Sequence, residues 1–568
     1  YRVNEQLRIK AYSYLSTDHR QLMNVSQNAF FFDTLRFNVR DSANWNSRPV
    51  VWASRFQVNY NKPDRYSLQF STDWKQTIAN TNLFVDVQNV FFPETVRLSQ
   101  QDRFNVAKHR LEWVRRLSET NVLTAEASYL TASLPQTLAI ASRRFADFLA
   151  IDPAYNQFSQ RATQQVTESK ASLFWKGRHE TALYSVGTGY VGERYQLTTA
   201  ATLKTPDAQV FTSVQFANAG TYTANSYFLD GTYSFRRRPF IFSVSNILRY
   251  AQIDYTDASQ NVRLSMGRFL WNPTGAIALD LGEQQRLTLA VARTQSLPTP
   301  QDLMAGYVVT DYRSLNRGTP VLNVVNSDAI ILRFNDFGFT RHYTILANVL
   351  ASRETNPYVY RLNITNSLSL FRTLPYNSSV YQYGAKTEVA RFAQALNVRF
   401  QLDGDASITN LVNFQGEDLV SSRLAKVEAG IAGVTAFDQA VNAELGTRFT
   451  ILRLTDNATD QTTDGLQQSL FIRPRFVLKI RPTKTTRFRL VNEWVHWENG
   501  PSVSNLFLTD GTFTWTPPKK PYSLELIGNN LLNVNTFNYT QFTGNYLITQ
   551  RQFMLQPRYV SIRAEWRF

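Results

Sequence analysis

The sequence predicts an all-β protein, a transmembrane antiparallel β-barrel, and three observations support this fold class. Apolar and polar residues alternate at period two along the whole chain, which is typical of strands with two different faces. Tight polar turns recur at intervals of roughly 50 residues. Mean hydropathy is −0.31, and no apolar run is long enough for a transmembrane helix. A barrel explains all three, because alternation of lipid-facing and lumen-facing residues keeps mean hydropathy low.

The alternating segments carry aromatic residues at the ends of their apolar faces. In one segment Tyr66, Leu68 and Trp74 share one face, while Ser67 and Lys75 lie on the other. A soluble sandwich could alternate in the same way, but it would rarely do so over 568 residues. Aromatic residues at such positions form the girdles of a barrel at the two membrane interfaces. We assign to these girdles Trp52, Tyr60, Tyr66 and Trp74.

The turns set the expected size of the barrel. They are predicted at 61–64, 118–121, 176–178, 236–239, 282–285, 335–338, 481–484 and 517–521, with weaker candidates near Ala393 and Phe437. Bacterial barrels have short periplasmic turns and long extracellular loops, so about ten turns predict about 22 strands. Outer loops are expected at 16–49, 131–166, 299–326 and 455–466. The stretch around Ala141–Ala150 has the pattern of a short helix, but an amphipathic loop segment with no role of its own is the favoured interpretation.

Charge and composition exclude several function classes. The formal charge is +16, but the basic residues interleave with apolar ones instead of clustering, so we expect a polar lumen and no nucleic-acid partner. The chain has no cysteine, which excludes thiol and zinc–cysteine chemistry. No catalytic constellation is present, so we expect neither an enzyme nor a bound cofactor. A glycine pattern at 187–192 precedes a strand-like segment, whereas a dinucleotide site needs a helix there.

The most informative polar residues are predicted to face the lumen near the turn at Pro482. In a plugged barrel they would contact the plug, in an open pore they would favour anions, and generic lumen polarity is equally compatible. These candidate contacts are Arg473, Arg475, Arg487, Arg489 and Glu493, with the four arginines expected to converge near the periplasmic end.

One metal site is a weak candidate. Asp456, Asp460 and Asp464 could hold calcium in an outer loop, although a solvated acidic loop is the favoured interpretation. No other metal site is predicted.

The last strand has an apolar face that ends at the final residue. Its members are Val560, Ile562, Ala564, Trp566 and Phe568. In lipid an unpaired strand edge is intolerable, so we expect the last strand to close the barrel against the first. A terminal Phe on such a strand resembles the assembly signal of outer-membrane proteins.

Three internal segments resemble one family. Leu289–Leu303 is similar to a strand that ends in a "P-x-x-x-L" stretch, and Asn316–Leu322 to a "G-N-P-x-L" loop in which Thr319 replaces Asn. Leu524–Asn533 is similar to an "N-L-x-N" segment of the penultimate strand. In this order and spacing they resemble the C-terminal barrel of TonB-dependent outer-membrane receptors, of the type with an upstream carboxypeptidase-regulatory-like domain and plug.

The resemblance implies one barrel domain over residues 1–568 in the cell outer membrane. Because strand patterning begins near Leu7, the plug is expected outside this chain. The implied function is energised uptake of a siderophore, oligosaccharide or peptide. The implied partners are the lipid bilayer and lipopolysaccharide, an upstream plug or other occupant of the lumen, TonB acting through the plug, and a surface lipoprotein. The alternative is a plugless or repurposed barrel that is a structural subunit of an outer-membrane assembly or secretion complex.

Overall fold

A computed structural model describes most of the chain. The described residues are 6–32, 35–63, 65–89, 94–338, 342–364, 368–415, 417–435, 440–456, 467–499, 502–543, 547–555 and 557–566. Among them, no helix is long and apolar enough to cross a membrane.

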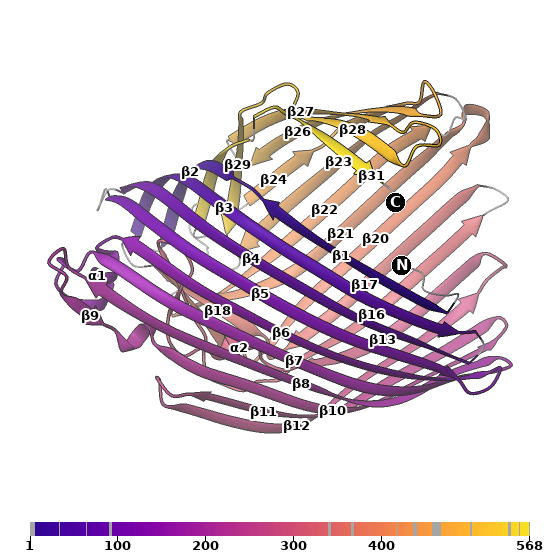
Figure 1. Ribbon diagram of the computed structural model, residues 1–568, viewed down its shortest axis with the longest axis horizontal. Helices are drawn as coiled ribbons and strands as arrows, with labels where there is room; N and C mark the ends of the chain where they lie inside the picture. The colour runs from indigo at the N-terminus through magenta and orange to yellow at the C-terminus, as the bar shows by residue number, and fades with distance from the viewer. Residues whose placement is uncertain are drawn as a thin grey trace.

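The architecture is one large sheet of antiparallel strands that curves into a barrel (Figure 1). Each long strand pairs with the next one along the chain. The wall runs through β1 (Leu7–Thr17), β2 (Arg20–Phe32), β3 (Leu35–Lys62), β4 (Tyr66–Asn89), β5 (Glu94–Arg116), β6 (Asn121–Ala141), β7 (Gln157–His179), β8 (Ala182–Lys204), β10 (Asn218–Arg237), β11 (Phe240–Asp257), β12 (Val262–Asp280), β13 (Gln285–Ser296), β16 (Val325–Gly338), β17 (Tyr343–Thr355), β20 (Ser379–Ala393), β21 (Val398–Gln415), β22 (Asp418–Thr435), β23 (Val441–Asp456), β24 (Gln467–Ile472), β25 (Arg475–Ile480), β26 (Thr486–Asn499), β27 (Ser502–Trp515), β28 (Tyr522–Asn529), β29 (Thr536–Thr543), β30 (Leu547–Met554) and β31 (Tyr559–Trp566).

The two ends of the chain meet in the wall. β1 and β2 pair with successive parts of β3, so together they form the first path across the wall. β31 pairs with β28, and β30 pairs with both β29 and β2. Pairing of β30 with β2 joins the last path to the first near the loop end. Among the described residues β31 pairs with β28 and β1 with β3, so closure of β31 against β1 stays a prediction.

The exact number of wall strands stays a prediction. The described residues form 31 strand segments in one sheet. Some of these are halves of a single path, such as β24 and β25, which both pair with β23 and with β26. Others belong to the connections, and they include β9 (Val210–Thr212). The all-β barrel class is confirmed.

Short turns lie at one end of the barrel, here called the turn end. Most lie where predicted, at 63–65, 117–120, 238–239, 281–284, 394–397, 481–485 and 516–521. Two predictions were wrong: residues 176–178 lie inside β7, and 335–338 inside β16. The glycines there do not turn the chain. An added Cβ at Gly177 would lie 2.2 Å from the ring of Tyr184, and one at Gly338 would lie 2.4 Å from the ring of Tyr343, so each makes room for the opposite tyrosine.

Longer connections lie at the other end, here called the loop end. The expected outer loop at 16–49 was wrong: β2 and β3 continue their ladder through it, from Arg20 opposite Ser47 to Phe32 opposite Leu35. Most of 131–166 is also strand, and the connection is shorter. It contains α1 (Arg144–Leu149), the short helix that the sequence had favoured less than an amphipathic loop segment, and Phe145 of this helix packs in an apolar cluster. The connection after β13 agrees with prediction, whereas the loop at 455–466 lies almost entirely outside the described residues.

The outer face of the wall is apolar and bounded by aromatic pairs. Tyr60 and Tyr66 pack beside one turn with ring centroids 5.7 Å apart. Trp74 lies about 26 Å farther along β4 than Tyr66. It packs edge-to-face on Trp52 at 4.7 Å. Between the two pairs the outward residues include the exposed Leu68 and Phe56. The predicted girdle residues therefore bound an exposed apolar belt.

Candidate functional site

Two loop-end connections fold into the barrel instead of projecting from it. The first, after β13, contains α2 (Pro300–Leu303), β14 (Val308–Val309) and β15 (Ser314–Arg317). The second, after β17, contains β18 (Tyr358–Ile364) and β19 (Ser369–Pro375). β15 pairs with β14 and β19, and β18 pairs with β19 and the loop end of β21. We call β14, β15, β18 and β19 the bridging sheet.

The bridging sheet reaches from β21 to wall strands much earlier in the chain. The side-chain amide of Gln160 on β7 accepts the N–H of Val309 at 3.0 Å and donates to the carbonyl of Tyr307 at 3.4 Å. Asn218 on β10 accepts the N–H of Gly306 at 2.8 Å. Figure 1 places β18 and α2 within the outline of the barrel. The bridging sheet therefore crosses the lumen near its loop end.

A buried ion pair fixes the same connection to β3. Arg313 Nη1 lies 3.1 Å from Asp41 Oδ2, and the side chain of Asp41 is only 3% exposed. Tyr312 is partly buried, and burial raises the pKa of its hydroxyl. A charge taken out of water needs a partner of opposite sign, so this pair holds the connection to one position on the wall.

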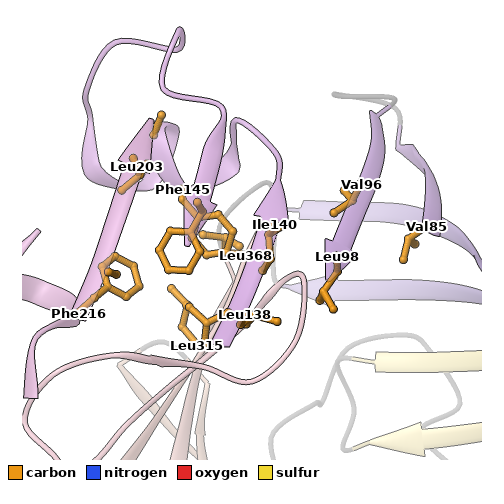
Figure 2. Packing of buried hydrophobic residues seen from close by; sticks show 14 of the residues in the cluster. Val85, Val96, Leu98, Leu138, Ile140, Phe145, Leu203, Phe216, Leu315 and Leu368 are labelled. Atoms are coloured by element: carbon orange, nitrogen blue, oxygen red, sulfur yellow. The ribbon is translucent and has the colours of Figure 1, made fainter. Parts of the chain in front are cut away.

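An apolar cluster packs between the bridging sheet and the wall (Figure 2). Phe145 of α1 stacks on Phe158 of β7 with ring centroids 4.0 Å apart. Leu315 and Leu368, from the two inward connections, pack into the same cluster as Ile140 of β6. All five side chains are almost fully buried. The cluster packs α1 against the wall.

Two of the family-like motifs lie against each other at the start of the bridging sheet. Thr299 donates from its N–H and its hydroxyl to the carboxylate of Asp302, which caps α2. The N–H of Gly318 donates to Met304 O, and that of Thr319 to Asp302 O, both at 2.7 Å. An added Cβ at Gly318 would lie 2.4 Å from Asp302 O, so only glycine fits against the backbone there.

The third motif has a similar structural role at the junction of β28 and β29. The side chain of Asn530 donates to Val534 O at 2.8 Å and accepts the N–H of Val534 at 2.9 Å. Asn530 and Asn533 both have positive φ, which asparagine tolerates better than most residues. The motif therefore closes a tight turn within one path across the wall.

A cavity of about 1140 Å³ lies beside the bridging sheet. Tyr360, Phe371 and Asn316 line it from the bridging sheet, and Phe104 and Gln164 from the opposite wall. The lining mixes aromatic rings with amides, carboxylates and arginines, a composition typical of a small-molecule site. The cavity thus lies between the wall and the inward connections, and it is partly open.

The fold and this lumen can be compared with known proteins. No protein-family model matches the sequence, and neither does any curated protein. The ferric yersiniabactin uptake receptor FyuA from Yersinia pestis is 10% identical, with a TM-score of 0.50 over 96% of this chain and 80% of FyuA. The copper transporter OprC is also 10% identical, with a TM-score of 0.50 over 94% of this chain and 80% of OprC. This chain has the fold of a TonB-dependent receptor barrel.

In this barrel the predicted lumen residues form two groups. Arg473 lies at the break between β24 and β25, and its Nε donates to Glu493 at 2.8 Å. Arg475 pairs across the strands with Glu493 and forms an ion pair with Glu444 at 3.3 Å. Carboxylates of the wall therefore already partner these two arginines.

Arg487 and Arg489 form the second group, nearer to the turn. Arg489 lies opposite Lys479 and Arg487 opposite Thr514, and both arginines are exposed. Neither makes an ion pair with another described residue. The four arginines do not converge at one point. Arg473 and Arg475 lie beside Glu493, whereas Arg487 and Arg489 lie nearer the turn along β26. Their role as plug contacts stays a prediction.

The terminal strand has the predicted face. Val560, Ile562 and Trp566 on β31 are strongly exposed on the outer side. Trp566 stacks on Tyr522 of β28 at 5.3 Å, which continues the aromatic belt at the turn end. Phe568 lies outside the described residues, so its role in assembly stays a prediction.

The calcium candidates are not placed by the structure. Asp460 and Asp464 lie outside the described residues, and of Asp456 only the backbone is described. Within the described ranges, no group of three or more acidic or histidine side chains could hold a metal ion.

Sequence reasoning missed the bridging sheet. β18 and β19 have strand-like alternation. In β18, for example, Tyr360 and Leu362 lie on one face and Arg361 on the other, but that pattern equally predicts an outer hairpin. The sequence signal that could have indicated the bridging sheet is a short pair of strands between two wall strands. Its direction into the lumen depends on contacts with β7 and β10, which local sequence does not encode.

Proposed function

We propose that this chain is the barrel of a TonB-dependent receptor in the cell outer membrane, which takes up a nutrient by an energised mechanism. The observation that supports this most directly is the bridging sheet with its cavity. A passive porin has an aqueous channel, whereas here two connections cross the lumen and border a partly open chamber on the path through the barrel. The proposal is transport, not catalysis.

The chamber supports a small organic ligand as substrate. A volume of about 1140 Å³ slightly exceeds the usual range for drug-sized ligands. Its aromatic and amide lining suits a siderophore, a short oligosaccharide or a peptide. The structural neighbours FyuA and OprC are, by name, a ferric yersiniabactin receptor and a copper transporter, and they leave the substrate class open.

The proposed transport needs partners. A plug supplied upstream or by another chain would occupy the turn-end lumen, where Arg487 and Arg489 are exposed. TonB would act through that plug, a surface lipoprotein could deliver ligand at the loop end, and the outer wall would contact lipid and lipopolysaccharide. These partners are part of the proposal.

Uptake measurements in paired strains test the proposal. Cells that express the full receptor, with and without TonB, are supplied with labelled ferric siderophores, oligosaccharides and peptides. We expect one class to accumulate only in the TonB-containing strain. Ala162→Trp, which fills the chamber from β7, should abolish accumulation, whereas Ala171→Trp on the outward face of β7 should not. Copurification with a stoichiometric assembly complex and no uptake of any class would favour the structural-subunit alternative.

A further inference from the structure

Three arginines lie side by side on the bridging sheet. Arg317 of β15 is opposite Arg372 of β19, and Arg372 is opposite Arg361 of β18. Neighbouring strands are about 4.8 Å apart, so the three side chains leave the sheet within about 10 Å of one another. Residues that are directly opposite share a face, so all three project to the same side.

That side is directed toward the loop end of the barrel. Arg317 and Arg372 share their face with Leu315 and Leu370, which pack in the apolar cluster, whereas residues such as Asn316 and Phe371 on the other face line the cavity. Arg317 also borders the cavity. On every wall strand that contributes to both, the cluster lies nearer the loop end than the cavity. On β6, for example, Ile140 belongs to the cluster and Pro135 to the cavity. The arginines therefore lie on the side from which an external ligand would arrive.

Protein groups leave most of this positive charge uncompensated. Arg361 pairs with Glu417, but that carboxylate is 86% exposed. Arg317 lies over the ring of Tyr307 at 5.3 Å, and Arg372 Nε donates to the hydroxyl of Thr319 at 3.3 Å. Neither Arg317 nor Arg372 makes an ion pair with any described residue. Burial and the two neighbouring arginines lower the pKa of Arg372.

Two donors in the row are buried without an acceptor. The Nε atoms of Arg317 and Arg361 are shielded from solvent, and neither has a hydrogen-bond partner in the part of the chain that the structure describes. Like charges directly across a strand pair are destabilising, and buried unsatisfied donors are rare in folded proteins. An oxyanion removes both penalties, because guanidinium groups bind carboxylate or phosphate through two parallel hydrogen bonds.

We propose that Arg317, Arg361 and Arg372 form a binding site for an oxyanion, a carboxylate or phosphate group, on the loop-end face of the bridging sheet. The role of this site as the first contact of the imported ligand rests on the proposed uptake function. In that role the site requires the imported ligand to be an anion. Anion binding itself does not depend on transport. Because Arg317 also borders the chamber, the site adjoins it, and the two would hold the ligand successively.

Calorimetry on the purified full chain in detergent tests the site, with citrate as the carboxylate probe and pyrophosphate as the phosphate probe at constant ionic strength. We expect saturable binding of at least one probe, and the probe that binds identifies the anion class. Arg372→Gln should weaken it about tenfold, since it removes the central charged donor. Arg372→Lys keeps the charge without the fork and should recover part of the affinity.

Matched variants control for general charge effects. Arg448 is an exposed lumen arginine that already pairs with Asp403 and Glu428. Arg448→Gln should leave the affinity unchanged. Heat-dependent gel mobility establishes that each variant is folded, and Arg361→Gln gives an independent readout if Arg372→Gln is not. The proposal is overturned if neither probe binds at about 1 mM, or if folded Arg372→Gln and Arg361→Gln bind as the parent does. Uptake without anion binding would refute this site alone, and anion binding without uptake would refute the transport function alone.

Discussion

At the scale of single residues, the lumen contains both buried and exposed ion pairs. Arg313 and Asp41 form a pair whose side chains are 17% and 3% exposed, and the two residues are 272 positions apart in the chain. Arg55 and Asp73 also pair, but their side chains are 46% and 35% exposed. Removing one member of a buried pair leaves an isolated charge out of water, whereas an exposed charge is simply hydrated.

Arg313→Ala should therefore destabilise the barrel by about 3 kcal/mol, measured by urea unfolding in detergent. Arg55→Ala is the control and should cost less than about 1 kcal/mol. Adding Asp41→Asn to Arg313→Ala removes the stranded charge and should restore part of the loss. Equal effects of the two arginine substitutions would show that burial does not determine the strength of the Arg313 pair.

Glycine at 318 is a second residue whose role depends on its contacts. Gly318→Ala places a Cβ 2.4 Å from Asp302 O, so α2 and β15 must separate. We expect the connection after β13 to become sensitive to protease while the wall stays folded. Gly231→Ala is the matched control, because an added Cβ there meets nothing within 4 Å. Unchanged protease resistance in Gly318→Ala would show that this joint does not hold the bridging sheet.

At the scale of elements, the two faces of the last strand, β31, follow directly from its alternating sequence. β31 alternates Val560, Ile562 and Trp566 outward with Arg563 inward, where Arg563 pairs with Glu525 of β28 at 3.3 Å. Deleting Phe568, or replacing it with Ser, should reduce the fraction of folded barrel in the outer membrane, because the outer face of the last strand is shortened. Heat-dependent gel mobility measures that fraction. Phe513→Ser, on the outer face of β27, separates loss of an apolar side chain from loss of the terminal one. A normal yield of folded protein without Phe568 would contradict an assembly role.

Most wall elements could be predicted because their signal is local. Alternation gave the strands, and polar residues at 118–121 and 481–484 gave the turns within a residue or two. The wrong turns at 176–178 and 335–338 have one cause. Glycine in a polar stretch is ambiguous between a turn and a place for an aromatic ring on the opposite strand. Only the register, with Gly177 opposite Tyr184, distinguishes the two.

The candidate site could not be predicted because its contacts are not local. Gln160 and Val309 are 149 positions apart, and local patterning carries no information on which wall strand a connection will meet. The sequence drew attention to Arg473 and Arg475, which are partnered by wall carboxylates. It gave no reason to single out Arg317, Arg361 and Arg372, because each lies in a different short strand and only the pairing of β15, β18 and β19 brings them together.

At the scale of the whole molecule, the bridging sheet divides the lumen. Toward the loop end lie the apolar cluster, α1 and the arginine row, and the cavity lies farther from the loop end, with Arg317 of the row at its border. A barrel of this size without an occupant would be a wide aqueous pore. The chain's own connections thus occupy part of the lumen.

Single-channel conductance measures how much of the lumen the bridging sheet closes. We expect the full chain in a planar bilayer to give small conductance steps. Replacing residues 299–321 with a short glycine–serine linker should raise the conductance severalfold, because it removes α2, β14 and β15 from the lumen while every wall strand is kept. Shortening the connection at 205–213, which contains β9 beside β8, is the control and should leave conductance unchanged. If the linker variant conducts as the parent does, the inward connection does not limit the pore. Large conductance steps from the parent itself would contradict a closed lumen. They would favour an open barrel, which a plug or partner must fill.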